Sequence, residues 1–273
     1  MRTRSLAVAA ALWLGSAATA SAETVVLVQG YLGSPGTWRN SGIAATLHNH
    51  GWADSGHLTL SPAGVLKFGP TAENGRRLVT VDLPTEAPTV IQADMLAHYV
   101  AELRRQTGEK RVVVVGHSAG GVVGRLAMVR HPGAGIDGLV TIASPHLGTG
   151  AADMGRVIGQ SPLSWITPFL GLGTVNRSQA LYHDLSEERP WNLLGWLNRQ
   201  PHPEASYVSV VRVRNGARPD LGDSIAYGFS QDMNVVPALQ GKAETVFSPG
   251  DHGLRPDDGL LLVDLLKRMT PSV

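Results

Sequence analysis

The sequence of 273 residues contains no cysteine. This absence excludes disulfide bonds, a thiol nucleophile and metal sites built from thiolates. Charged residues are also scarce, at 16%, and they nearly cancel, because the formal net charge is +1. A near-neutral chain has no electrostatic reason to bind nucleic acid or an anionic membrane. We therefore expect no nucleic-acid partner, and a stability that depends on the hydrophobic core alone.

A run without charges follows the short basic start of the chain. Residues 5–20 are mostly Ala, Leu and Val, and they lead into the small residues Ala20-Ser21-Ala22. The run is shorter than the ~20 apolar residues that a membrane-spanning helix needs. A basic start, a short apolar run and a small-residue site are typical of a secretory signal peptide. We expect cleavage after residue 22, so that residues 23–273 form one soluble domain in the periplasm or the medium.

Apolar stretches of strand length alternate with helical periodicity through most of the chain. Strands are expected at residues 24–29, 78–83, 112–115, 139–143, 207–213 and 244–247, and helices at 34–50, 90–106, 122–128 and 256–268. We expect residues 52–77 to be an irregular excursion with short strands at 58–60 and 65–68. The alternation predicts an α/β fold, with a mostly parallel sheet and helices on both faces. Ligands bind such folds at the carboxyl ends of the strands.

The clearest candidate site is Ser118, in the pattern Gly116-His117-Ser118-Ala119-Gly120. A buried strand is predicted directly before it and a helix directly after it, which is the context that a nucleophile elbow requires. Gly116 and Gly120 leave room for the sharp turn. The helix N-terminus favours negative charge, and the N–H group of Ala119 is placed to bind an oxyanion. We interpret Ser118 as the nucleophile and His117 as a structural or pocket residue.

A nucleophilic serine needs a histidine base. Among the five histidines that follow Ser118, only His252 comes directly after the last predicted strand, in a Gly/Asp-rich loop. That loop reaches the same edge of the sheet as Ser118. We therefore expect His252 to be the base.

The base in turn needs an acid, and the segment between the last two strands offers Asp220, Asp223 and Asp232. Asp232 is our first choice, because the apolar residues after it return the chain to the core. Asp223 is the second choice, since it lies in a turn-rich segment where aspartate commonly bonds the local backbone. Asp251, next to His252, is interpreted as a turn residue.

Residues 150–205 interrupt the alternation and hold three of the six tryptophans, Trp165, Trp191 and Trp196. We expect this segment to form a cap or lid with an apolar underside that receives the substrate. The alternative is a set of ordinary helices packed on the core.

The whole stretch from residue 23 resembles the α/β-hydrolases, and within them the secreted bacterial lipases and esterases. The resemblance rests on residues 26–33, 116–121, 141–149, 232–237 and 250–252. It implies a compact α/β-hydrolase fold with a catalytic triad of Ser118, Asp232 and His252. It also implies that the backbone N–H groups of Tyr31 and Ala119 form the oxyanion hole. Gln29 stands where that family usually has histidine.

By this resemblance, the expected activity is hydrolysis of carboxylic esters with apolar acyl chains, with at most transient contact with a lipid surface. No cofactor is expected. Some lipases hold calcium near the histidine loop, but Asp257 and Asp258 do not match such a site convincingly, so no metal is predicted. A thioesterase, a phospholipase or an acyltransferase would use the same triad. A binding protein on an inactive hydrolase scaffold is the alternative from another class.

Overall fold

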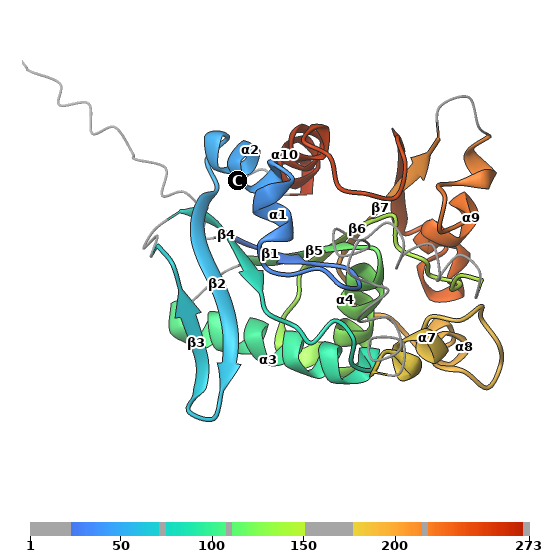
Figure 1. The fold of residues 1–273 in the computed structure, drawn as a ribbon, viewed down its shortest axis with the longest axis horizontal. Coiled ribbons are helices and arrows are strands. Elements are labelled where there is room, and N and C mark those ends of the chain that lie inside the picture. The colour runs from blue at the N-terminus through green and yellow to red at the C-terminus, as the bar shows by residue number, and fades with distance from the viewer. Residues whose placement is uncertain (1–22, 71–74, 108–110, 151–176, 215–217, 270–273) are drawn as a thin grey trace, which may run out of the picture.

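The computed structural model describes residues 23–70, 75–107, 111–150, 177–214 and 218–269. Within these residues, one sheet has the strand order β3-β2-β4-β1-β5-β6-β7-β8 (Figure 1). The strands span Glu23–Val28 (β1), Ala53–Ser61 (β2), Gly64–Phe68 (β3), Arg76–Val81 (β4), Arg111–His117 (β5), Gly138–Ile142 (β6), Ser206–Val213 (β7) and Ala243–Pro249 (β8). All neighbouring pairs are parallel except β2 and β3. The expected mostly parallel sheet is confirmed.

Helices lie on both faces of this sheet, α3 and α4 on one and α1, α2 and α10 on the other (Figure 1). The helices span Thr37–Asn40 (α1), Ile43–Asn49 (α2), Thr89–Thr107 (α3), Ala119–Arg130 (α4), Gln179–Asp184 (α7), Leu193–Asn198 (α8), Gly228–Gln231 (α9) and Asp257–Met269 (α10). Short 3₁₀ turns cover Pro132–Ala134, Pro219–Leu221, Met233–Val235 and Pro237–Leu239. Successive side chains of a strand point to opposite faces. In β1, Val25 and Leu27 therefore join one core cluster, and Val26 and Val28 join the other.

The expected helix over residues 34–50 is divided into α1 and α2. Gly42 separates them with a φ of 82°, a left-handed conformation that glycine adopts readily and other residues avoid. Both short helices bury apolar side chains against the same face of the sheet, including Trp38 and Ile43. The left-handed turn at Gly42 lets α1 and α2 pack their apolar side chains into the same core cluster.

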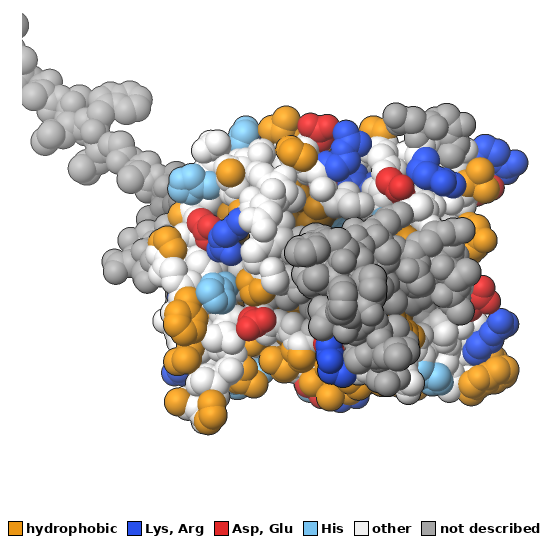
Figure 2. Space-filling model, viewed as in Figure 1, with side chains coloured by type: hydrophobic (Ala, Val, Ile, Leu, Met, Phe, Trp, Pro, Cys, Tyr) orange, Lys and Arg blue, Asp and Glu red, His pale blue; other side chains and the backbone are white. Residues whose placement is uncertain are grey.

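Residues 52–77 were expected to be an irregular excursion with short strands at 58–60 and 65–68; these two strands are present within β2 and β3, and both strands are longer than expected. β2 pairs in parallel with β4 and in antiparallel with β3, so β2 and β3 form a hairpin at one edge of the sheet. Leu60, Leu66 and Phe68 of this hairpin are exposed, and hydrophobic side chains gather over it at the left of Figure 2. Because these exposed residues are apolar, the burial pattern of the hairpin was not readable from hydrophobicity.

The expected cap, residues 150–205, is described only in its second half, because residues 151–176 lie outside the described ranges. Residues 177–205 include α7 and α8. Leu181, Leu194 and Leu197 are fully buried in the same core cluster as α3 and α4. This half therefore packs on the core, and a cap with an apolar underside that receives the substrate stays a prediction.

The expected signal peptide, residues 1–22, also lies outside the described ranges, and its cleavage stays a prediction. Across the residues that are described, no helix combines the length and the apolar character that crossing a bilayer requires.

Candidate active site

Ser118 lies at a sharp turn between β5 and α4. Its φ of 53° and ψ of −126° are strained values for a residue with a Cβ atom. The turn is possible because residues 116 and 120 are glycines without a Cβ atom. A Cβ atom at Gly116 would lie 2.5 Å from the Cα atom of Gly121, and one at Gly120 would lie 2.5 Å from the carbonyl oxygen of Gln29. The N–H group of Ser118 donates to the carbonyl of Ile142 over 2.8 Å. The neighbouring chain segments therefore hold the serine in its strained position.

His252, in the loop between β8 and α10, contacts Ser118 directly. Its Nε2 atom lies 2.8 Å from Ser118 Oγ, and its Nδ1 atom lies 2.9 Å from Asp223 Oδ2. An ionised carboxylate can only accept, so Nδ1 carries the proton and Nε2 is free to accept the hydroxyl proton of Ser118. The side chains of His252 and Asp223 are 8% and 0% exposed. The structure thus brings the predicted nucleophile and the predicted base into one hydrogen-bonded chain.

Asp223, and not Asp232, is the carboxylate that contacts His252, which corrects our first choice of acid. Asp232 Oδ1 instead accepts hydrogen bonds from the backbone and side-chain amides of Asn234 and from the hydroxyl of Thr245. These contacts cap the 3₁₀ turn Met233–Val235 and tie it to β8. Asp232 therefore has a local structural role. The apolar residues that follow it do return the chain to the core, but this did not place Asp232 beside His252.

Asp223 was the second choice because it lies in a turn-rich segment. Its carboxylate does bond the local backbone of that turn, and it contacts His252 as well. Its Oδ1 atom accepts from the backbone N–H groups of Ile225 and Ala226, at 2.7 and 2.8 Å. Its Oδ2 atom accepts from His252 and from Gln231 Nε2. One oxygen fixes the turn and the other faces the histidine, so a turn interpretation and a triad interpretation of Asp223 are compatible.

The residues expected to donate to the oxyanion, Tyr31 and Ala119, both lie in segments next to Ser118. Ala119 is the first residue of α4, so its N–H group has no acceptor within the helix. Gly30, which precedes Tyr31, approaches the elbow closely, since a Cβ atom there would lie 2.9 Å from the Cβ atom of Ser118. The loop that carries the N–H group of Tyr31 is therefore packed directly against the nucleophile.

The side chain of Tyr31 anchors this loop to the segment around α7. Its hydroxyl donates to Ser178 Oγ over 3.0 Å and lies 2.6 Å from the hydroxyl of Tyr182. The two tyrosine rings meet edge to face, with centroids 5.5 Å apart. The loop is thus held from a segment about 150 positions away, which the sequence did not indicate.

His117, the neighbour of the nucleophile, faces the backbone of the base. Its Nε2 atom lies 2.7 Å from the carbonyl oxygen of His252, and the two imidazole rings are 5.3 Å apart. Loss of hydration and the adjacent imidazole of His252 lower the pKa of His117 to about 3. The ring is therefore neutral at ordinary pH.

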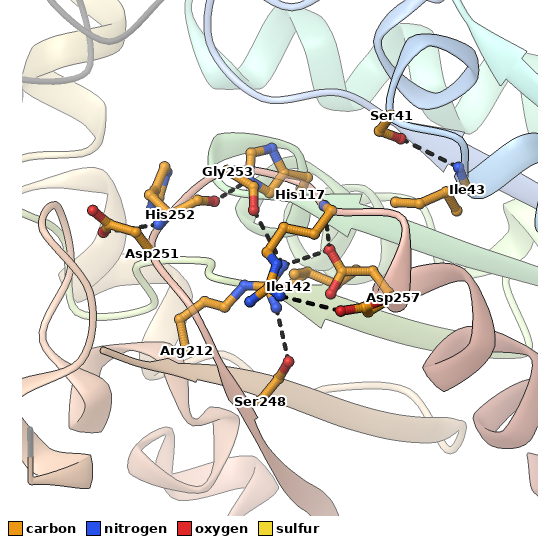
Figure 3. Close-up of polar contacts among 12 residues, drawn as sticks. Ser41, Ile43, His117, Ile142, Arg212, Ser248, Asp251, His252, Gly253 and Asp257 are labelled. Carbon is orange, nitrogen blue, oxygen red and sulfur yellow. Dashed lines mark hydrogen bonds and ion pairs between the residues drawn. The ribbon is translucent and has the colours of Figure 1, made fainter. Parts of the chain in front are cut away.

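The loop that carries His252 is held by further polar contacts, several of which are drawn in Figure 3. Arg212 of β7 is fully buried and donates to the carbonyl of Gly253, the hydroxyl of Ser248 and the carboxylate of Asp258. Asp251 Oδ1 accepts from the N–H groups of His252 and Ser224, and so links this loop to the loop that holds Asp223. Sequence reasoning missed Arg212 and assigned Asp251 only to a turn.

The described residues contain no group of three or more His, Asp or Glu side chains suited to hold a metal ion. Asp258 is paired with Arg212 in the core, and Asp257 is paired with Arg255 at the surface. The two acidic residues considered for calcium therefore have partners of opposite charge.

Comparison with known proteins agrees with this architecture. Residues 19–156, half of the chain, match the PGAP1-like alpha/beta domain family. No curated protein matches the sequence.

Solved structures give a broader match to the fold. The mature form of the Bacillus licheniformis lipase BlEst2 superposes with a TM-score of 0.59 at 16% identity, covering 93% of this chain and 94% of that one. The lin2722 gene product of Listeria innocua gives 0.60 at 13% identity, covering 90% and 92%. A highly thermostable carboxyl esterase from Bacillus coagulans gives 0.52 at 11% identity, covering 92% and 91%. At such identities the likeness establishes the α/β-hydrolase fold and leaves the reaction to the site.

Proposed function

This chain belongs to the PGAP1-like alpha/beta domain family, and we propose that it hydrolyses carboxylic esters of apolar acyl chains. The observation that carries the proposal is the continuous hydrogen-bonded chain from Ser118 Oγ through the His252 ring to Asp223 Oδ2, with steps of 2.8 and 2.9 Å. A serine, a histidine and a buried carboxylate in this order constitute the machinery of acyl transfer through an acyl-enzyme.

The reaction has two halves that use the same residues. In the first, His252 Nε2 removes the proton of Ser118 as Oγ attacks the ester carbonyl, and the N–H groups of Tyr31 and Ala119 stabilise the resulting oxyanion. The intermediate then expels the alcohol, which takes the proton from His252. In the second half, His252 activates water in the same way, and attack on the acyl-enzyme releases the carboxylic acid and restores Ser118.

Asp223 contributes by orientation and charge. Because Asp223 Oδ2 accepts from Nδ1, the proton of the neutral His252 ring is held away from Ser118, and Nε2 is available as the acceptor when each half-reaction begins. When His252 becomes a cation in each half-reaction, the buried carboxylate stabilises it.

The substrate class rests on two kinds of support. Two of the structural relatives are named as a lipase and a carboxyl esterase. The sequence resemblance is likewise to secreted lipases and esterases. We further propose that residues 1–22 direct the chain to the periplasm or the medium, where such esters are encountered.

The test is hydrolysis of p-nitrophenyl esters from acetate to palmitate by the purified protein, with Ser118→Ala as the matched control. We expect hydrolysis by the wild type and its loss in the variant at unchanged thermal stability. A rate that rises with chain length supports an apolar acyl site, and activity on acetate alone limits the protein to short esters. Folded wild-type protein that cleaves none of the series contradicts the proposal. Acyl transfer to an added alcohol in preference to water would instead identify an acyltransferase.

A further inference from the structure

The base is held by its main chain as well as by its side chain. The N–H group of His252 donates to Asp251 Oδ1 over 2.9 Å, and its carbonyl oxygen accepts from His117 Nε2 over 2.7 Å (Figure 3). The side chain contacts Ser118 and Asp223. Every polar atom of His252 therefore has a hydrogen-bond partner.

Two of these contacts come from consecutive residues of the elbow and close a small ring. Ser118 contacts the imidazole of His252, while His117, one peptide bond away, contacts the carbonyl of the same residue. The elbow itself does not yield, because Ser118 is fixed by its bond to Ile142 and by the close packing at its glycines. The His117 contact is therefore one of the contacts that set the distance between the His252 loop and the nucleophile, and it is the one that comes from the elbow itself.

The chemistry of the His117 contact is unambiguous, since a carbonyl oxygen can only accept a hydrogen bond. The Nε2 atom of His117 must therefore carry a proton, and the ring acts as a donor. Its low pKa keeps it neutral, so no second positive charge forms beside His252 when the base is protonated. A neutral donor fixes the loop without opposing the proton transfer.

Because the ring of His117 faces a main-chain atom, it contacts neither of the atoms that exchange the proton. Resting on the function proposed above, we propose that His117 is a positioning residue, whose Nε2–H group holds the imidazole of His252 in register with Ser118. Loss of this donor leaves the loop attached through Asp251 and Arg212. The protein should then fold, with its base free to shift relative to the nucleophile.

The experiment compares two substitutions in the full-length protein. His117→Leu removes the donor at similar size, and His117→Gln places an amide N–H at a similar reach. We expect His117→Leu to lower kcat by about 10- to 100-fold, because small displacements of a general base have effects of this order, with KM nearly unchanged. His117→Gln should recover most of that loss. A purely structural residue would instead change stability, and rescue would not depend on the donor.

Two further measurements separate this proposal from the proposed function. The first is the rate at which a fluorophosphonate labels Ser118, which reports activation of the serine by its base without a carboxylic ester substrate. The second is the downfield proton resonance of the His252–Asp223 hydrogen bond, which we expect to shift in His117→Leu and return in His117→Gln. If the wild type is labelled but cleaves no ester, the substrate proposal fails, and the labelling rates still test His117. Should His117→Leu not fold, His117→Phe provides a second side chain without a donor.

A folded donorless variant with wild-type turnover and labelling would overturn the positioning role. Equal losses in His117→Leu and His117→Gln, with both folded, would overturn it as well, because rescue by a donor is its central expectation.

Discussion

Replacing Asp223 by Asn tests whether Asp223 is the acid of the triad. The substitution keeps the size and shape of the side chain and changes which nitrogen of His252 carries the proton. In the structure, Asp223 Oδ1 accepts from two backbone N–H groups, those of Ile225 and Ala226. An asparagine must keep its carbonyl oxygen at that place, because an amide NH₂ there would face two donors. Its NH₂ group is then directed at His252 Nδ1, where the carboxylate oxygen had been.

The consequence for His252 is a change of tautomer. An amide N–H that donates to Nδ1 requires the ring proton to reside on Nε2, the atom 2.8 Å from Ser118 Oγ. Nε2 is then a donor and cannot accept the serine proton. In a serine protease triad the same substitution lowers kcat by about 10⁴-fold, which corresponds to about 5 kcal/mol of transition-state stabilisation. We expect a loss of this order for Asp223→Asn.

Asp232→Asn is the matched control, because its contacts with Asn234 and Thr245 all use one oxygen that an asparagine retains. Both variants are assayed on the best p-nitrophenyl ester of the series, with thermal unfolding measured alongside. The control should keep activity within about threefold and lose at most ~1 kcal/mol of stability, the worth of a typical hydrogen bond. The reasoning is refuted if Asp232→Asn abolishes turnover while Asp223→Asn remains active.

Three further outcomes can be checked by unfolding measurements. Arg212→Met should cost about 3 kcal/mol in urea unfolding, because it leaves the buried carboxylate of Asp258 without its partner; adding Asp258→Leu should recover part of the loss. Gly120→Ala should cost about 2–3 kcal/mol, since the new Cβ atom would lie 2.5 Å from a backbone oxygen at the end of β1; an unchanged Tm would contradict this. Burial by itself raises the pKa of Asp54, but hydrogen bonds from Arg39 and a backbone N–H outweigh it and leave the pKa below its ordinary value. The stability difference between wild type and Asp54→Asn should therefore be present at neutral pH and disappear as pH falls through the folded-state pKa, below the usual ~3.9.

The nucleophile was predictable because its signal is local. The valines before Ser118 predict a strand buried on both faces, the glycines around it permit a tight turn, and the residues after it predict a helix, all within one short stretch. His252 was predictable for a related reason, since it directly follows the last strand of a parallel sheet. In both cases the order of the elements along the chain places the residue at the active edge.

The acid was not predictable in the same way, because Asp223 and Asp232 lie in one connection between β7 and β8. Which of them faces the histidine depends on how that connection folds, and Asp223 reaches a partner 29 positions along the chain. The division of residues 34–50 at Gly42 was likewise not predicted. It is tied to tertiary packing, because α1 and α2 bury their apolar side chains in the same core cluster. Local sequence patterns do not indicate either arrangement.

Sequence alone determined the alternation of the main strands and helices, the turn at Ser118 and the edge of the sheet where the site lies, because these follow from hydrophobic periodicity and local sterics. Only the tertiary structure decided which carboxylate serves His252 and which groups hold its main chain. Those contacts, from Asp223 and from His117 at a separation of 135 residues, depend on distances between loops that are neighbours in space and not in sequence.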